Sequence, residues 1–278
     1  MKHFISFLIL IVLLSLSAQA AIRTVDPKGG AQYTSIRAAL QDADAGDIIR
    51  LAPGTYDKEQ ITVDKDVTIQ GSGAKVTVIT GNFDPVITQK AGIIKWVTVI
   101  SKSGDGINMS ANAMITNLVA KDCKAAGISI LSNTCKVNNC LATNNGIGIY
   151  IEYTAVKSII INCISYNNTS NYGAGGLWNY PISRYCSAFG TGGGNWSNCI
   201  NCLTSDPMIN TDYRLDNLKS PCVNGGDPTI FDWDGTISDM GYYGGPDAPM
   251  QPYISLPASF KLNDDGTMQF KLKGRVGY

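Results

Sequence analysis

A segment of just over twenty residues recurs along the middle of the chain, and this repeat constrains the fold more than any other feature. One column of the repeat advances by 21 residues through Asp84-Pro85-Val86-Ile87, Asp105-Gly106-Ile107-Asn108, Ala126-Gly127-Ile128-Ser129 and Ile147-Gly148-Ile149-Tyr150. In a second column, the run 115–120 returns 22 residues later as 137–142, and Cys140, Cys163 and Cys186 follow at intervals of 23. Short strand-like runs at this period, with Gly or Asn at the corners, predict the coils of a parallel β-helix.

A single helix signal precedes the strand-like runs. Thr34 or Ser35 is the expected N-cap, apolar residues follow at helical spacing, and residues 44–47 end the helix. Strands are expected at residues 48–51, 61–63 and 67–70. The pattern predicts an all-β chain of roughly six to eight coils, in which a helix over residues 34–43 covers the open N-terminal end.

The N-terminal residues have the pattern of a secretory signal. Lys2 precedes an apolar run over residues 4–16, and Ala18-Gln19-Ala20 supplies a small-residue cleavage site before Ala21. The run is too short to span a bilayer, and no later segment is long and apolar enough to do so. We therefore expect a protein that is secreted, periplasmic or on the cell surface, with no membrane span.

Composition excludes several classes of chemistry. The 22 basic and 22 acidic residues balance, which disfavours a nucleic-acid partner. His3 is the only histidine, and signal cleavage would remove it, which excludes His-dependent nucleophiles, metal sites and general acid/base catalysis. Between Cys123 and Ser205 the one acidic residue is Glu152, so a glycosidase site with two carboxylates cannot be built there.

All eight cysteines lie in the part that would be exported, where disulfides are permitted. Their pairing cannot be read from the spacing. Cys199 and Cys202 form a CxxC motif, for which redox or zinc chemistry is the alternative to structural thiols or bridges.

Two stretches of the chain resemble a known family. Residues 24–40, Ala45-Gly46-Asp47, Ala52-Pro53-Gly54-Thr55-Tyr56 and residues 65–69 resemble the N-terminal cap of secreted pectin-lyase-like β-helix proteins. Residues 205–226 and 232–245 are similar to the closing segment of many bacterial β-helix proteins. The resemblance covers residues 22–247 and implies a right-handed parallel β-helix. It implies no one activity, because this fold hosts lyases, hydrolases, esterases and adhesins.

These patterns divide the chain into five parts. They are a signal peptide over 1–20, a cap with the first coils over 21–83, β-helix repeats over 84–205, a closing segment over 206–250, and a β-hairpin or the start of a further module over 251–278.

The resemblance allows each family activity to be checked. Polygalacturonase-type hydrolases carry a Gly-His-Gly segment that the mature chain lacks, and the paired-Asp, Gln and Arg motifs of pectin methylesterases do not appear. A polysaccharide lyase remains open, since β-elimination needs a Lys or Arg base and a cation such as Ca²⁺. Asp84 and Asp105 would share such a cation across one coil, unless they are turn residues, and Asp232, Asp234 and Asp239 form a second candidate group.

Strand alternation predicts a binding face. If Val86, Ile107, Ile128, Ile149 and Leu177 point inward, two columns of side chains point outward. The first holds Ile87, Asn108, Ser129, Tyr150 and Trp178, and the second holds Gln89, Ser110, Leu131, Glu152 and Tyr180. Tyr150, Glu152, Trp178 and Tyr180 would then form a sugar-binding face, with aromatic rings for sugar faces and polar groups for hydroxyls. The alternative is that a loop over 166–174 folds over these rings.

The sequence therefore predicts a β-helix protein that binds extracellular polysaccharide through Tyr150, Glu152, Trp178 and Tyr180, without strong catalysis. The alternative is a Ca²⁺-assisted pectate or uronate lyase with a Lys or Arg base. No resident metal or other cofactor is expected under the first hypothesis, and whether the protein is an enzyme is left open.

Overall fold

The computed structural model describes residues 20–57, 59–155, 157–174, 182–190 and 199–249, and four short strands between residues 253 and 275. Residues 1–19, which hold nearly all of the expected signal peptide, lie outside this part. Among the described residues, no helix is both long and apolar enough to cross a bilayer.

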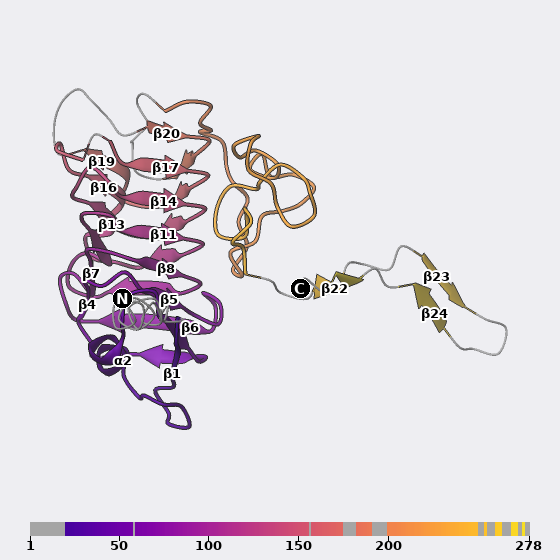
Figure 1. Cartoon of the computed structure of the whole chain (residues 1–278). Coiled ribbons are helices and arrows are strands. Elements are labelled where there is room, and N and C mark those ends of the chain that lie inside the picture. Colours follow the sequence, from indigo (N-terminus) through magenta and orange to yellow (C-terminus); the bar gives the residue numbers. More distant parts are fainter. Residues whose placement is uncertain are drawn as a thin grey trace, which may run out of the picture.

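The chain winds through three parallel sheets, and each coil visits them in the order sheet 3, sheet 1, sheet 2 (Figure 1). Sheet 1 consists of β1 (Ile22–Val25), β2 (Ile48–Leu51), β5 (Thr68–Gln70), β8 (Ile93–Lys95), β11 (Met114–Thr116), β14 (Lys136–Asn138), β17 (Ile159–Ile161) and β20 (Ile182–Arg184). Sheet 2 consists of β3 (Gly54–Tyr56), β6 (Thr77–Gly81), β9 (Thr98–Ser101), β12 (Val119–Lys121), β15 (Leu141–Thr143), β18 (Ile164–Tyr166) and β21 (Ser187–Phe189). Sheet 3 consists of β4 (Ile61–Val63), β7 (Ile87–Gln89), β10 (Ile107–Met109), β13 (Ala126–Ile130), β16 (Ile147–Ile151) and β19 (Ser170–Ala174).

This is a right-handed parallel β-helix of about seven coils, as the repeat and the resemblance predict. Aliphatic side chains at matched positions of successive coils fill its interior. Ile107, Ile128 and Ile149 are paired in register and have no exposed surface. Each such side chain stabilises the fold by roughly 1.5 to 3 kcal/mol through burial, which explains the apolar columns of the sequence.

The predicted helix is α2 (Ile36–Asp42), and it packs against β1, β2 and β4 at the N-terminal end of the stack. Ser35 is its N-cap and accepts the N–H of Ala38. The carboxylate of Glu59 accepts the first helical N–H groups, and the ammonium of Lys65 donates to three carbonyls at the C-terminal end. Both charges have the sign that the helix dipole favours at their ends, so the following coil fixes the helix in place.

Two steps of the predicted register are wrong. Ile107 pairs with Ile87 and not with Val86, so Thr88 and not Ile87 lies beside Asn108. Gln89 pairs with Met109 and is fully buried, with its side-chain amide donating to backbone carbonyls. Val86 and Ile87 are both fully buried, so hydrophobicity could not choose between the two registers.

The second wrong step concerns the coil after Ile149. Ile149 pairs with Tyr172 of β19 and not with Leu177. Residues 170–174 therefore continue sheet 3, whereas the sequence suggested a loop. Ser170-Asn171-Tyr172-Gly173-Ala174 lacks the aliphatic residues of the preceding strands, and the hydrophobic pattern consequently failed to mark it as a strand.

Asparagine residues turn the chain at two corners of several coils. Asn117, Asn139 and Asn162 have positive φ angles between sheets 1 and 2, while Asn144 and Asn167 have them between sheets 2 and 3. Asn is among the few residues that adopt this left-handed conformation readily. Asparagine side chains of successive coils also bond to one another, since Asn167 donates to Asn144 and Asn145 donates to Asn168.

The closing segment, residues 206–249, folds back beside the stack, where Figure 1 shows it in orange. Its backbone bonds to the corner between sheets 1 and 2. Asn117 donates to the carbonyls of Tyr242 and Gly244, and Asn162 both donates to Ser238 and accepts the N–H of Asp227. The corner asparagines therefore set the turn of each coil and also hold the closing segment.

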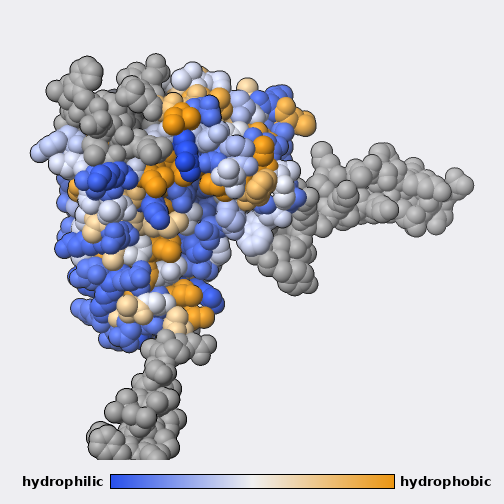
Figure 2. All heavy atoms as spheres, turned by 45° about the horizontal axis from the view of Figure 1, so that its top comes forward, coloured by the Kyte–Doolittle hydropathy of each residue, from blue (hydrophilic) through white to orange (hydrophobic). Residues whose placement is uncertain are grey.

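Several hydrophobic residues gather in the middle of the view in Figure 2, between the coils and the closing segment, whereas hydrophilic residues cover much of the coil surface. A second cluster of buried residues joins the two parts there, and Val119, Leu141, Ile164, Cys222, Met240 and Tyr242 belong to it. The closing segment therefore shields part of the outer face of sheet 2. Beyond it, β22 (Tyr253–Ile254) pairs antiparallel with β25 (Gly274–Arg275), and β23 (Ser259–Leu262) pairs antiparallel with β24 (Met268–Lys271).

Candidate functional site

The outer face of sheet 3 carries two of the four predicted binding residues side by side. Tyr150 lies on β16, and Glu152 directly follows that strand. The Tyr150 hydroxyl donates a hydrogen bond of 3.0 Å to Oε2 of Glu152, and both residues are partly exposed. Alternation along β16 explains this, because Ile149 and Ile151 point into the core and leave their neighbours outside.

Trp178 and Tyr180, the other two predicted residues, lie outside the described part of the chain. The register correction nevertheless changes their expected place, because Gly173 and not Trp178 pairs with Tyr150 in the next coil. Of the four predicted side chains, the described part of the chain contains Tyr150 and Glu152.

A ladder of short polar side chains extends from this pair along sheet 3. Ser129 lies beside Tyr150, Asn108 beside Ser129, and Thr88 beside Asn108. Parallel pairing spaces them at about 4.8 Å per coil. The Oδ1 atom of Asn108 is buried and has no hydrogen-bond partner among the described residues. Ser129 is buried and its hydroxyl donates to Asp105, so the partly exposed members of this ladder are Thr88, Asn108 and Tyr150.

Asp84 and Asp105 are close together, as the sequence predicts, but both accept hydrogen bonds within the fold. Oδ1 of Asp84 accepts the N–H of Asp105, and Oδ1 of Asp105 accepts the N–H of Ala126. Oδ2 of Asp105 accepts the hydroxyl of Ser129. These contacts make each aspartate a link between one coil and the next, which is the turn role that was the alternative to cation binding.

The environment keeps the Tyr150 hydroxyl protonated. Burial raises its pKa, and the hydrogen bond to Glu152 and the negative charges of Glu152 and Asp105 raise it further. A protonated hydroxyl that is hydrogen-bonded to a carboxylate serves as a hydrogen-bonding group and not as a base.

Two exposed apolar residues beside the pair were not selected from the sequence as a site. Tyr153 is 64% exposed and its N–H donates to Glu152, while Leu131, at the end of the neighbouring strand β13, is 37% exposed. Leu131 was placed in the outward column, but Tyr153 was missed because it lies past the end of the strand. Its position directly after Glu152 in the sequence could have identified it as part of the same surface. We call Leu131, Tyr150, Glu152 and Tyr153 the β16 patch.

The aspartates of the closing segment bond mainly to nearby backbone. Asp232 accepts the N–H groups of Asp239 and Gly245, and Asp239 accepts the N–H of Asn224. Burial raises the pKa of Asp239 to about 6, and the charges of Asp232 and Asp234 raise it further. Burial also raises the pKa of Asp232.

A pH dependence of stability follows from Asp239. Its pKa is raised in the folded state, so the folded protein binds more protons than the unfolded chain between about pH 4 and pH 6, and stability falls as pH rises through this window. We expect Asp239→Asn to unfold at a higher temperature than the wild type at about pH 8 and to lose this part of the pH profile. Thermal unfolding of both proteins across the pH range measures it. An Asp239→Asn protein that is less stable at pH 8, with an unchanged profile, would contradict the assignment.

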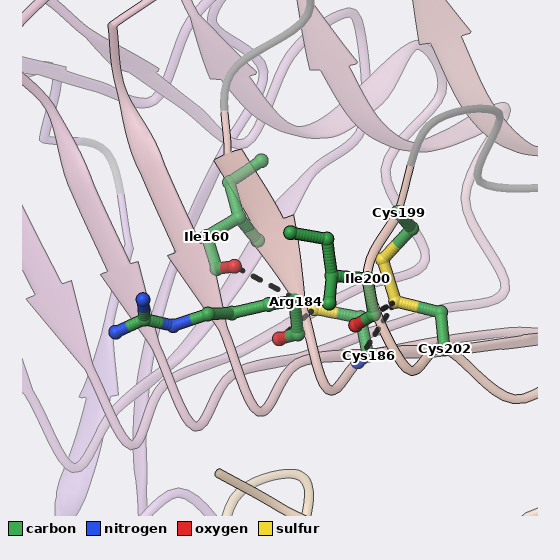
Figure 3. Close-up of a disulfide and its surroundings, with 6 residues drawn as sticks. All are labelled: Ile160, Arg184, Cys186, Cys199, Ile200 and Cys202. Carbon is green, nitrogen blue, oxygen red and sulfur yellow. Dashed lines mark hydrogen bonds between the residues drawn. A yellow bond between two sulfur atoms is a disulfide. The ribbon is translucent and has the colours of Figure 1, made fainter.

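The cysteines fall into two groups. Cys123, Cys135, Cys140, Cys163, Cys186 and Cys222 are buried free thiols. Cys199 and Cys202 form a disulfide at the far end of the coil stack, next to Cys186 (Figure 3). Burial raises the pKa of Cys163 and Cys186 well above the ordinary value, so both are neutral thiols in this structure.

Comparisons with known proteins concern the fold. No family model and no curated protein matches the chain. Among solved structures, ORF18 of Geobacillus virus E2 is 16% identical to this chain with a TM-score of 0.43. The match covers 64% of this chain but only 42% of the viral protein. Pectate lyase Pel9A is 14% identical with a TM-score of 0.44, covering 81% of this chain and 96% of the lyase. Pectin methylesterase PemA from Erwinia chrysanthemi is 12% identical with a TM-score of 0.39, covering 91% and 86%. By its own strand pairing, the chain is a right-handed parallel β-helix protein.

Proposed function

We propose that the protein binds an extracellular polysaccharide on the outer face of sheet 3, centred on the β16 patch. The observation that carries this proposal is the paired, partly exposed Tyr150 and Glu152 beside the exposed ring of Tyr153. Aromatic rings take the apolar faces of sugars, and a carboxylate that accepts hydrogen bonds takes their hydroxyls. The proposal includes the expected export of the protein, since such polymers lie outside the cell.

The shape of the face suits an extended polymer. The polar ladder from Thr88 to Tyr150 runs along the stack, with one side chain per coil. A chain of sugars laid along this direction meets the partly exposed Thr88 and Asn108 about 4.8 Å apart, and the ring of Tyr150 two coils further on. Binding is then spread over several weak contacts in a row.

The proposal predicts the effect of removing the Tyr150 ring. We expect Tyr150→Ala to weaken polysaccharide binding severalfold, since one ring contact contributes on the order of 1 kcal/mol. Tyr150→Phe keeps the ring and loses only the hydroxyl bond to Glu152, so we expect a smaller loss. Affinity electrophoresis against a panel of acidic and neutral polysaccharides measures both.

Tyr33 supplies a matched control. Its hydroxyl also donates to a carboxylate, Oδ2 of Asp42, but at the N-terminal helix. Tyr33→Ala is expected to leave the affinity unchanged. Equal binding by Tyr150→Ala and the wild type to every retained polymer would refute the proposed face.

The lyase alternative is tested with the same polymers. Incubation with uronate polymers and Ca²⁺ would give unsaturated products, which absorb in the ultraviolet, if a Lys or Arg base performs β-elimination. We expect retention on the gel without a rise in absorbance.

A further inference from the structure

Sulfur atoms form a column inside the β-helix that ends at its C-terminal opening. Cys140, Cys163 and Cys186 directly precede β15, β18 and β21, three paired strands of sheet 2. Cys202 directly precedes Leu203, which bridges to Ser187 of β21, so Cys202 takes the same place one coil later. The column thus runs from the fully buried interior to a partly exposed end at Cys199 and Cys202.

Three of these cysteines meet at that end. The sulfur atoms of Cys186, Cys199 and Cys202 all lie within 4.8 Å of one another. The backbone N–H of Cys186 donates to the sulfur of Cys202 at 3.2 Å, and the close-up in Figure 3 shows this contact beside the Cys199–Cys202 disulfide. Two single bridges, Arg184 with Ile200 and Ser187 with Leu203, hold this segment on the last coil. The cluster is therefore positioned by backbone pairing on both sides of Cys186.

We propose that, once the Cys199–Cys202 disulfide is reduced, the sulfur atoms of Cys186, Cys199 and Cys202 bind one Zn²⁺ ion. Zinc–sulfur bonds of about 2.3 Å in tetrahedral geometry hold their sulfur atoms roughly 3.8 Å apart. After reduction, the Cys199 and Cys202 sulfur atoms therefore have to move apart, while both already lie within 4.8 Å of the Cys186 sulfur. Cys199 and Cys202 have the CxxC spacing of a zinc knuckle and are partly exposed, which leaves the fourth position open to solvent.

Electrons and protons balance in the reduction of the disulfide and the binding of zinc. An external dithiol reductant supplies two electrons, two protons complete the thiols of Cys199 and Cys202, and the reductant becomes a disulfide. Binding of Zn²⁺ then displaces the protons of three thiols to solvent. The disulfide and the zinc site are therefore alternative states of the same two sulfur atoms, with Cys186 as the third ligand in one state alone.

Charge favours Zn²⁺ over Cu⁺, the other common thiophilic ion. Three thiolates leave a net charge of −1 around Zn²⁺ and −2 around Cu⁺. Arg184 is the cation next in the chain to this cluster, but its guanidinium pairs with Asp227 at 2.9 Å, and its side chain extends away from the sulfur atoms in Figure 3. Because the charge of Arg184 is already paired with that of Asp227, the less negative zinc complex is favoured over the copper complex.

The test uses the full chain, reduced and metal-free. Competition with a chromophoric chelator measures Zn²⁺ affinity, and Co²⁺ serves as a spectroscopic probe, because the intensity of its sulfur charge-transfer bands follows the number of bound thiolates. We expect one ion per chain with three thiolates. Cys186→Ser and Cys199→Ser should each weaken Zn²⁺ binding by tenfold or more and reduce the charge-transfer intensity.

Cys140→Ser is the matched control, since Cys140 has the same place in its coil but lies two coils from the cluster. It should keep full affinity. If Cys186→Ser does not fold, the partly exposed Cys199 still provides the decisive variant. Absence of Zn²⁺ binding by the reduced chain, unchanged affinity in Cys199→Ser, or binding of Cu⁺ in place of Zn²⁺ would each overturn the proposal.

Discussion

Asn162→Ala is expected to destabilise the protein by about 2 to 4 kcal/mol. Asn162 is fully buried, its Nδ2 donates to Ser238, and its Oδ1 accepts the N–H of Asp227. Removal of the side chain leaves a buried N–H without a partner, which costs about 1 to 3 kcal/mol. Alanine must also adopt the left-handed conformation at a φ of 55°, which costs roughly 1 to 2 kcal/mol.

Two further variants separate these terms, all measured by denaturant unfolding. Asn162→Gly loses the same hydrogen bonds without the backbone strain, and we expect it to be less destabilised than Asn162→Ala by about 1 kcal/mol. Asn144 has a φ of 56° but is exposed and does not contact the closing segment through a hydrogen bond in the described structure. Asn144→Ala should therefore show the strain term together with the loss of one exposed hydrogen bond, the one that Asn167 donates to Asn144. Equal losses at positions 144 and 162 would show that Asn162 does not hold the closing segment.

Ile149→Ala is expected to cost about 2 to 5 kcal/mol through the cavity it leaves in the core. Ile149 has no exposed surface and pairs with Ile128 on one side and Tyr172 on the other. Its neighbour Tyr150 faces outward, so Tyr150→Ala should cost less than about 1 kcal/mol.

This pair of variants tests the register of sheet 3. A one-residue shift would exchange the inner and outer faces and reverse the order of the two effects. Denaturant midpoints at equal m-values provide the comparison. A larger loss in Tyr150→Ala than in Ile149→Ala would place the Tyr150 ring in the core and remove the β16 patch.

The repeat was sufficient to predict the coils, because inward aliphatic side chains recur from coil to coil and a corner Asn recurs in several of them. The second column of the sequence aligned Asn139 with Asn162 and Cys140 with Cys163, and the pairing of β15 with β18 confirms it. The N-cap at Ser35 could also be predicted, because the signals that begin and end a helix lie close together in the sequence.

The sequence was insufficient where two residues satisfied the same physical requirement. Val86 and Ile87 are both buried, so either one fitted the inward column. β19 was missed because its pattern is polar, and its identity as a strand comes from pairing with β16. The contacts between corner asparagines and the closing segment join residues 65 to 127 positions apart, and no periodicity specifies such pairs.

The sequence predicted only part of the candidate site. Alternation placed Tyr150 and Glu152 on the outer face, and the structure adds the hydrogen bond between them and the exposed Tyr153. The meeting of Cys186 with Cys199 and Cys202 depends on bridges to the last coil. Spacing alone suggested the CxxC motif but not its third partner.

Hydroxyl-radical footprinting with and without a bound polysaccharide tests the proposed binding face most directly. Tyr153 and Leu131, which are 64% and 37% exposed, report on the β16 patch, whereas Leu218, Phe231 and Trp233 are 93%, 53% and 59% exposed on the closing segment. We expect a retained polymer to lower the oxidation rates of Tyr153 and Leu131 severalfold and to leave the closing-segment residues unchanged. Protection of Phe231 and Trp233, with Tyr153 and Leu131 oxidised at their free rates, would contradict binding at sheet 3.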